Sequence, residues 1–269
     1  MKAHALATAF GAISTFVSLT ILFAPPVYGQ SCTPSTDSGE AARSGESLTN
    51  PAGTAIVVSR QGERGLDAME SATNHGTIIT CGEVHEYTRD DGTPARRRAH
   101  AVQVDSVSGG GAAAENNGLI ETRGRAARGM AVFEYGDAAT ATATATNRGR
   151  IVTRGDLYDG SAHFGSPLIR TADGVLAETG RQAGDATAVN ERNSANDPQS
   201  GVIEVHGTGA RGMWVWTSGT GEARGINRGT ITTRGDAFGG PQSYGSAAAG
   251  IAAHSSQGSA TAINEEGAT

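Results

Sequence analysis

Aromatic residues are scarce in this 269-residue chain: phenylalanine, tryptophan and tyrosine together make up 5% of it, with only two tryptophans. A conventional globular core relies on such large side chains, so the composition argues against one. Glycine is abundant instead, at 39 residues, about twice its ordinary share. A chain that turns many corners around an interior of small side chains accounts for both features.

Positive charge is not in excess either, since the formal net charge is -6 at pH 7. Bulk electrostatic attraction to nucleic acid is therefore not expected. The seven histidines do not fall at metal-ligand spacing, and calcium-binding nonapeptides, nucleophile elbows, phosphate loops and dinucleotide fingerprints are missing. We accordingly expect no metal, no cofactor and no nucleic-acid partner.

Cysteine occurs only twice, at Cys32 and Cys81. An oxidising compartment would permit a disulfide between them, and two free thiols are the alternative. Cys81 takes the place of an arginine or histidine on the outward side of a repeated strand, so we expect it on the outside of the coil. A bridge would tie the N-terminal segment over the first coils and cover an exposed strand edge.

Long hydrophobic runs are absent except at the N-terminus. Residues 1–29 combine one basic residue, Lys2, with an apolar stretch and a small residue, Gly29, at the end. This pattern predicts a secretory signal peptide. A membrane anchor and a lipoprotein cleaved before Cys32 are the alternatives, although the run is short for a spanning helix. The polar segment 30–52 is expected to be a linker or an N-terminal cap.

The chain does contain a repeat. The phrase Asn-x-Gly-x-Ile-x-Thr-x-Gly occurs at 74–82, 116–124, 147–155 and 227–235, and a degraded copy at 199–207 has glutamine in place of asparagine. Because side chains alternate along a strand, the glycine, isoleucine and threonine face one way and the intervening, mostly polar residues the other. Asparagine and glycine tolerate left-handed backbone, so they mark the corners where the strand turns.

Two further phrases follow most copies. One is a short glycine-aliphatic strand such as Arg128-Gly129-Met130, which His100-Ala101-Val102 matches with histidine in the glycine position; the other is an Ala/Thr-rich run such as 138–146. Three strands and three corners describe one turn of a coil, and stacked turns form a parallel β-helix. We predict an all-β protein with about six such coils over residues 53–269. Insertions, alternately long and short, fall mostly between the first two strands and predict a row of loops along one edge.

Stacking places like residues in columns. The isoleucines are expected to stack inside the coil, each contributing roughly 2 kcal/mol by burial. This column contains Ile78, Ile120, Ile151, Ile203 and Ile231. The asparagines Asn74, Asn116, Asn147 and Asn227 are expected to form a ladder of side-chain amide hydrogen bonds. The threonines Thr80, Thr122, Thr153 and Thr233 are expected to behave likewise.

The export signal and these three phrases resemble the passenger domains of Gram-negative autotransporters and related large secreted adhesins. The resemblance covers about residues 50–269 and implies a right-handed β-helix displayed on, or released from, the outer membrane. Such passengers usually continue into a C-terminal β-barrel translocator, which would be a partner in cis. This sequence ends inside a repeat at Thr269 without such strands, so we expect a fragment of a longer protein.

An Arg-Gly-Asp tripeptide occurs twice, as Arg154-Gly155-Asp156 and Arg234-Gly235-Asp236. Both copies open long loops, where a binding motif would be displayed, and the tripeptide resembles the integrin-binding motif found in adhesins. The alternative is structural, because arginine and glycine already belong to the repeat. These residues are our candidates for binding a host receptor.

The outward side of the first strand carries a charged column, Arg123, Arg154, His206 and Arg234, beside Glu121 and Glu204. Glu121 and Glu204 are two coils apart, about 10 Å between backbones, which is near the upper separation for an inverting glycosidase pair. A polysaccharide-cleaving enzyme is therefore one interpretation. Counter-ions for the arginines are the simpler one.

A basic run, Arg96-Arg97-Arg98, lies in a long loop and would attract sulfated glycans or anionic surfaces. A solvated loop is the alternative interpretation. Taken together, the sequence predicts an exported β-helical protein, at the cell surface or outside the cell, that displays loops for adhesion to a receptor or glycan. The alternatives are a secreted β-helix enzyme acting on polysaccharide, through Glu121 and Glu204, and a structural stalk without a ligand.

Overall fold

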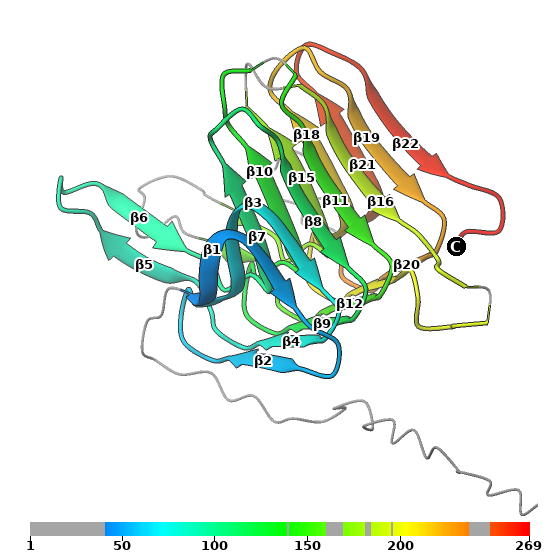
Figure 1. The fold of residues 1–269 in the computed structure, drawn as a ribbon, viewed down its shortest axis with the longest axis horizontal. Helices are drawn as coiled ribbons and strands as arrows, with labels where there is room; N and C mark the ends of the chain where they lie inside the picture. The colour runs from blue at the N-terminus through cyan, green and yellow to red at the C-terminus, as the bar shows by residue number, and fades with distance from the viewer. Residues whose placement is uncertain (1–40, 139, 160–168, 181–183, 195, 237–247) are drawn as a thin grey trace, which may run out of the picture.

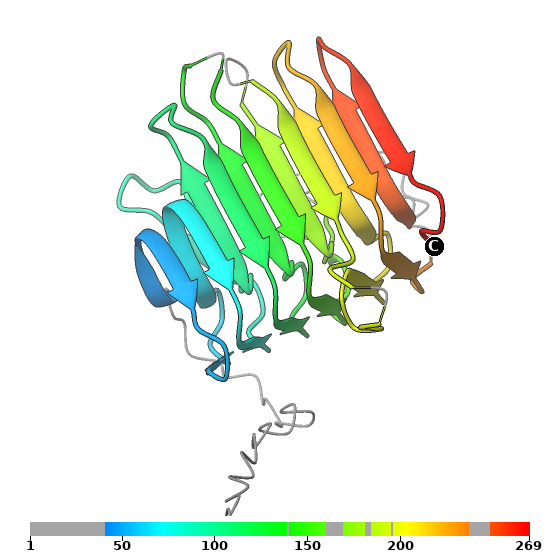
Figure 2. The same ribbon diagram turned by 45° about the vertical axis from the view of Figure 1, so that its right-hand side comes forward.

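The computed structural model describes residues 41–138, 140–159, 169–180, 184–194, 196–236 and 248–269; the predicted signal peptide and Cys32 lie outside them. All regular secondary structure within these residues is β-strand. No helix long and apolar enough to cross a membrane is found in this part of the chain. The chain winds as a parallel β-helix whose turns advance along one axis (Figures 1 and 2), which confirms the predicted fold class.

Most turns contribute one strand to each of three parallel sheets. The first sheet contains β2 (Ala55–Val58), β4 (Thr77–Thr80), β9 (Leu119–Thr122), β12 (Arg150–Thr153), β17 (Val202–Val205) and β20 (Thr230–Thr233). The second contains β7 (Val102–Ser106), β10 (Met130–Glu134), β15 (Val175–Thr179), β18 (Arg211–Thr217) and β21 (Ala249–Ser255). The third contains β8 (Ala112–Asn116), β11 (Ala143–Asn147), β16 (Ala186–Asn190), β19 (Ala223–Asn227) and β22 (Ala260–Asn264).

The second and third sheets are continuous at the N-terminal end. Strand β3 (Arg64–Asn74) pairs with β7 through its first half and with β8 through its second half. Strand β1 (Ala41–Asn50) pairs in parallel along β3. Strand β1 therefore lies inside the segment expected to be a linker or cap, and it covers the edge that β3 would otherwise expose.

Aliphatic side chains from all three sheets fill the interior as one core cluster. Strand register places Ile120, Ile151 and Ile231 in a single column that runs from Ile56 to the last turn. On the third sheet most inward residues are alanines, and they pack with valines and methionines of the second sheet. Small side chains on one side explain how a chain poor in aromatics closes a packed core.

The asparagine side chains form a continuous ladder along the axis. Each Nδ2 donates to the Oδ1 of the next asparagine at 2.7–2.8 Å. The ladder consists of Asn50, Asn74, Asn116, Asn147, Asn190, Asn227 and Asn264. The degraded repeat does not break it, because Asn190 rather than Gln199 occupies its place and the insertion 191–199 follows the ladder residue.

Glycines at both ends of the first-sheet strands stack where neighbouring turns approach closely. A Cβ on Gly149 would lie 2.1 Å from the Gly118 carbonyl oxygen, and one on Gly155 would lie 1.8 Å from that of Gly124. Any other residue would push the turns apart. The repeat therefore keeps glycine at these positions for the close backbone approach.

The threonine column does not form the predicted ladder. Thr122 Oγ1 donates to the Ala127 carbonyl at 3.1 Å, and Thr153 Oγ1 donates to the Ala172 carbonyl at 3.0 Å. Both bonds stay within one turn, because the corner after the strand brings a buried carbonyl that needs a donor within reach. Thr122 and Thr153 thus fasten the corner between the first and second sheets, whereas Thr80 Oγ1 is buried without a hydrogen-bond partner.

Candidate functional site

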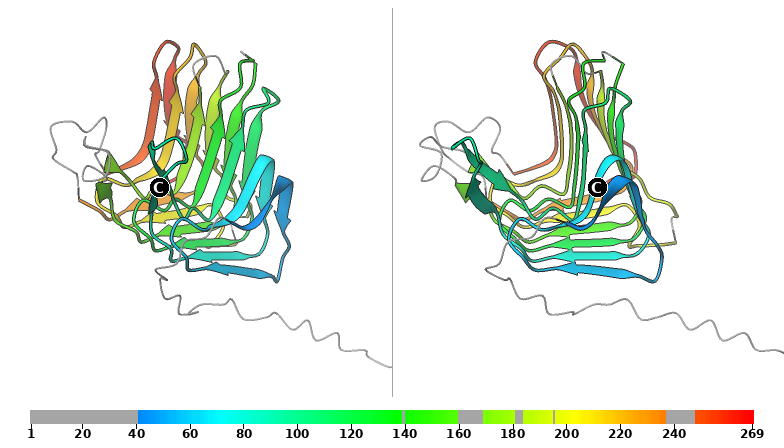
Figure 3. Two further views of the ribbon diagram at one scale, coloured as in Figure 1. Left: turned by 90° about the vertical axis from the view of Figure 1, so that its left-hand side faces the viewer. Right: turned by 60° about the vertical axis from the view of Figure 1, so that its left-hand side comes forward.

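The corner between the first and second sheets carries the long connections. Two of them contain antiparallel strand pairs, β5 (His85–Thr88) with β6 (Pro94–Arg97), and β13 (Tyr158–Asp159) with β14 (Ile169–Arg170). They project on the same side of the molecule (Figure 3). These connections are the row of loops predicted from the insertions. The third long connection, 237–247, lies outside the described residues.

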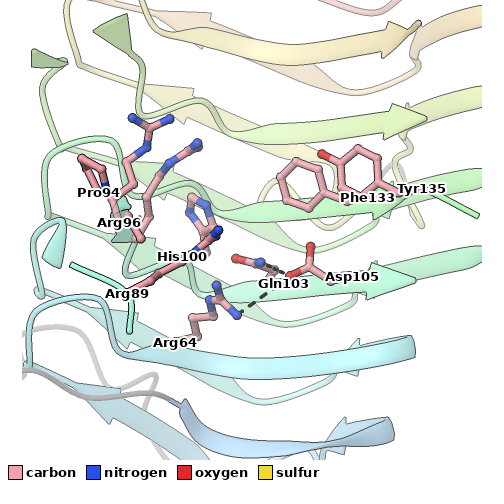
Figure 4. A pocket seen from close by; sticks show the side chains of 11 residues that line it. Arg64, Arg89, Pro94, Arg96, His100, Gln103, Asp105, Phe133 and Tyr135 are labelled. Atoms are coloured by element: carbon pink, nitrogen blue, oxygen red, sulfur yellow. Dashed lines mark hydrogen bonds and ion pairs between the residues drawn. The ribbon is translucent and has the colours of Figure 1, made fainter. Parts of the chain in front are cut away.

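A pocket of about 480 Å³ lies between the β5–β6 hairpin and the outward side of the second sheet (Figure 4). Its lining residues are Arg64, Arg89, Pro94, Ala95, Arg96, Arg98, His100, Gln103, Asp105, Phe133 and Tyr135. Four of these are arginines, and one is an aspartate. We call this site the arginine pocket. Its positive character contrasts with the net charge of -6 for the whole chain.

The floor of the arginine pocket holds a small polar network. Arg64 Nη1 lies 2.8 Å from Asp67 Oδ2 and 3.9 Å from Asp105 Oδ2, and Gln103 Nε2 also donates to Asp105. Burial raises the pKa of Asp105, and the bond from Gln103 and the charge of Arg64 offset this only in part. The pocket therefore contains a carboxyl group that takes up a proton more readily than an exposed one.

His100 enters the pocket as a neutral donor. Its Nδ1 accepts a hydrogen bond from the Arg128 backbone N–H at 2.9 Å, so in the neutral ring the proton is on Nε2. Burial lowers the pKa of His100 well below its usual value, and the charges of Arg98, Arg128 and Arg64 add to this effect. At neutral pH the ring therefore offers an N–H and carries no charge.

Behind the pocket lies a buried ion cluster. The Asp173 carboxylate receives Arg128 Nε at 3.0 Å and Arg211 Nε at 3.1 Å, and its own side chain is 0% exposed. Thr171 Oγ1 donates to the same carboxylate at 2.9 Å. Burial alone would raise the pKa of Asp173, but the charges of Arg211 and Arg128 outweigh it and the pKa is lowered. This cluster holds the loop-bearing corner against the second sheet.

Strand register explains the origin of these groups. The first inward aliphatic residues of the second-sheet strands are aligned by register. The residues two positions before them therefore form a column of their own, which consists of Arg64, His100, Arg128, Asp173 and Arg211. The sequence alignment of this phrase was wrong by one residue at His100, since Ala101 occupies the glycine position and His100 the charged one. The sequence did contain a signal for this column, because in most turns a titratable residue directly precedes the glycine or alanine that begins the second-sheet phrase.

The predicted basic run divides between two environments. Arg96 and Arg98 line the arginine pocket, whereas the Arg97 guanidinium lies 5.7 Å from the centre of the Tyr87 ring on the β5–β6 hairpin. Sequence reasoning missed Arg64, Arg89 and Asp105. They come from separate strands and a hairpin, and only the winding of the chain brings them to the run.

The first Arg-Gly-Asp tripeptide is engaged by neighbouring turns. Arg154 Nε lies 3.2 Å from Glu121 Oε1, and Asp156 Oδ1 accepts the backbone N–H groups of Leu157 and Thr208, each at 2.9 Å. These two bonds lower the pKa of Asp156. Arg234 and Asp236 of the second tripeptide are exposed, and the loop after them is not among the described residues.

Glu121 and Glu204 lie on β9 and β17, with Val152 of β12 between them in register. Glu121 receives Arg123 Nε at 3.0 Å and Arg154 Nε at 3.2 Å, and Glu204 receives Arg150 Nη2 at 3.0 Å. Burial would raise the pKa of Glu121, but the bonds and charges of Arg123 and Arg154 lower it overall. The geometry thus resembles counter-ions more than a general acid that must hold a proton.

Cys81 follows the inward Thr80, so by alternation it points to the outer side of the coil, the side expected for it, and its exposed fraction there is only 1%. It is disulfide-bonded. Cys32, the other cysteine of the sequence, lies outside the described residues. No group of three or more His, Cys, Asp or Glu residues that could hold a metal ion occurs in the described ranges.

Comparison with known proteins gives one finding at the level of families. No curated protein and no solved structure matches the chain. Residues 85–267, which include most of the arginine pocket and the strands from β5 to β22, match the family model described as the BigA third pectate lyase-like domain. The chain therefore belongs to the family of BigA third pectate lyase-like domains, whose description agrees with the β-helix found here.

Proposed function

We propose that this protein is an exported β-helical module of a bacterial surface or secreted protein, built like an autotransporter passenger, that adheres by holding an acidic glycan in the arginine pocket. The observation that carries the proposal is the pocket itself, where four arginines and a neutral histidine surround a volume of about 480 Å³. The family match supports a β-helical surface protein. The implied partners are a host-surface receptor or glycan and an outer-membrane translocator in cis.

The chemistry of the pocket favours carboxylate or sulfate groups on a sugar. Guanidinium groups offer planar pairs of N–H donors that match these oxyanions. Because the chain as a whole carries net negative charge, attraction of an anion depends on a local cluster of arginines such as this one. Gln103 and Asp105 on the pocket floor supply the polar partners that sugar hydroxyls require.

Binding to a sulfated polysaccharide and to neutral dextran, measured by surface plasmon resonance over a series of salt concentrations, tests the proposal. We expect salt-sensitive binding of the sulfated chain only, and at least a tenfold loss in Arg89→Gln/Arg98→Gln, about 1.4 kcal/mol. The matched control is Arg192→Gln/Arg224→Gln, which removes two exposed arginines elsewhere. Equal binding of dextran, or equal losses in both double variants, would contradict the proposal.

A secreted enzyme acting on polysaccharide is the second candidate. It is favoured by the position of Asp105 inside a sugar-sized pocket and by the raised pKa of this carboxyl group, since a raised pKa suits a carboxyl group to serve as a general acid. Release of reducing ends from acidic polysaccharides, lost in Asp105→Asn but retained in Glu121→Gln, would establish this activity and its residues. A stalk without a ligand predicts neither binding nor product release.

The second Arg-Gly-Asp tripeptide offers a separate route to adhesion through a receptor. Asp236 is the better candidate than Asp156, whose carboxylate is occupied by two backbone N–H groups. Cell attachment that falls in Asp236→Glu but not in the arginine-pocket variants would assign adhesion to Arg234-Gly235-Asp236 instead.

A further inference from the structure

The outward side of the second sheet is unusually rich in rings. Register aligns Asp105, Phe133, Glu178, Trp216 and His254 in one column on five successive strands. Trp214 lies beside Trp216 on β18, with ring centres 5.5 Å apart, and Trp216 lies 4.9 Å from the His254 ring. Both tryptophans are partly exposed. We call Tyr135, Trp214 and Trp216 the aromatic row.

The two tryptophans of the aromatic row are held in place from the buried ion cluster. The Arg211 guanidinium lies 3.6 Å from the centre of the Trp214 ring, and Arg211 itself is fixed by Asp173 and by a 2.9 Å bond from its Nη2 to Thr171 Oγ1. Trp214 in turn contacts Trp216. Rings that are already ordered lose little conformational entropy when a ligand stacks on them.

The aromatic row is continuous with the arginine pocket. Phe133 and Tyr135 line the pocket, their rings stack at 5.8 Å, and Phe133 is two strand positions from Trp216 in the same column, about 10 Å along the axis. Tyr135 Oη donates to Glu178 at 3.2 Å, in the column between them. Trp216 Nε1 is buried, so the indole face of Trp216, which is partly exposed, is the part of this side chain that a ligand can reach.

We propose that the aromatic row binds pyranose rings of the same acidic polysaccharide, so that the glycan chain runs along the β-helix axis from the arginine pocket to Trp216. The inference rests on the proposed function and specifies its ligand as a polymer. Aromatic rings can stack on the apolar faces of sugar rings. Because the rings of the aromatic row are spaced along the β-helix axis, they suit a ligand that extends in that direction. A ligand that reaches from the Asp105 strand to Trp216 spans three strand steps, about 14 Å, which is longer than one sugar.

Tryptophan emission gives a direct test, because the only two tryptophans of the chain lie in the aromatic row. The probes are a length series of sulfated oligosaccharides, a sulfated monosaccharide and inorganic sulfate. We expect emission to change, and affinity to rise, only once the oligosaccharide is long enough to cover both sites. Trp216→Leu should lower affinity for the long probe about tenfold. Trp216→Phe keeps an aromatic ring and should lower this affinity less than about threefold.

Two outcomes separate this inference from the proposed function. If long and short sulfated probes bind equally in an Arg98-dependent manner, without a change in emission, the aromatic row is not a binding site and the arginine-pocket proposal stands. If no sulfated probe binds at all, both proposals fail. Circular dichroism of Trp216→Leu, together with retained binding of inorganic sulfate or the monosaccharide, identifies a variant that is folded.

Discussion

The asparagine ladder and the outward side of the second sheet differ in how far they follow the repeat. The ladder repeats one residue from Asn50 to Asn264 with nearly constant hydrogen-bond lengths. On the outward side of the second sheet, one column changes from Asp105 to Phe133, Glu178, Trp216 and His254. A stack of turns constrains inward positions to be alike, but leaves outward positions free to vary.

The difference indicates where ligand-binding chemistry resides in this molecule. Like residues stack because each inward side chain must fit the equivalent side chain of the adjacent turn. A mismatch there loses a hydrogen bond or leaves a cavity. Unlike residues gather beside the loop-bearing corner, where the long connections rise and the arginine pocket opens (Figures 3 and 4). Departure from the repeat is thus the informative signal, and four measurements would sharpen or break this contrast.

The largest effect is expected from Gly155→Ala. The added Cβ would lie 1.8 Å from the Gly124 carbonyl oxygen, so neighbouring turns must separate and the protein should lose more than about 4 kcal/mol or fail to fold. Gly92→Ala at the hairpin tip is the control: it has φ +81° but open space around it, and should cost about 1 kcal/mol. Urea denaturation measures both, and similar losses would show that stacking is not what requires glycine.

Asp173→Asn should cost about 3–5 kcal/mol, because it leaves Arg128 and Arg211 buried without their shared counter-ion. Glu83→Gln, which breaks an exposed pair with Arg125, should cost less than about 1 kcal/mol. The lowered pKa of Asp173 gives stability that is present above about pH 3.9 and is lost as pH falls through its folded value. The two stability curves should therefore converge only in strong acid.

Asn147→Ala should cost about 2–4 kcal/mol, since it unpairs the Asn116 donor and the Asn190 acceptor in the middle of the ladder. Asn264→Ala at the last turn should cost well under half as much, because that position is exposed. Equilibrium unfolding compares the two. Equal losses would mean that the hydrogen bonds contribute little beyond the packing of the side chain.

His100→Gln should change the pH dependence of the free energy of unfolding more than it changes the free energy of unfolding at neutral pH. Burial and nearby arginines lower the folded-state pKa of His100 below about 6.5. The unfolded chain therefore takes up the proton first, so stability is full above pH 6.5 and falls as pH drops below it, by at most about 1.4 kcal/mol per pH unit. The variant should flatten this slope, whereas His75→Gln at an exposed position should leave it unchanged.

Much of the architecture was accessible from the repeat alone. The phrase around Ile151 has strand periodicity with glycine corners, and periodicity is a local property that needs no knowledge of the partner turn. The insertions between the first two strands of the repeat likewise indicated a row of loops. Errors arose where register was ambiguous: Gln199 was matched to the asparagine position of the repeat, which Asn190 occupies, and His100 was placed one residue away from its column.

The sequence by itself determined the coil, its inward columns and the edge that bears loops, because these follow from side-chain alternation and from glycine positions along the chain. Only the tertiary structure decided that Arg64, Arg89 and Arg98 surround one pocket and that two tryptophans continue it. Residues far apart in the chain meet through the number of residues in each turn and the path of each loop. Those lengths carry no periodic signal, so the pocket emerges only once the turns are stacked.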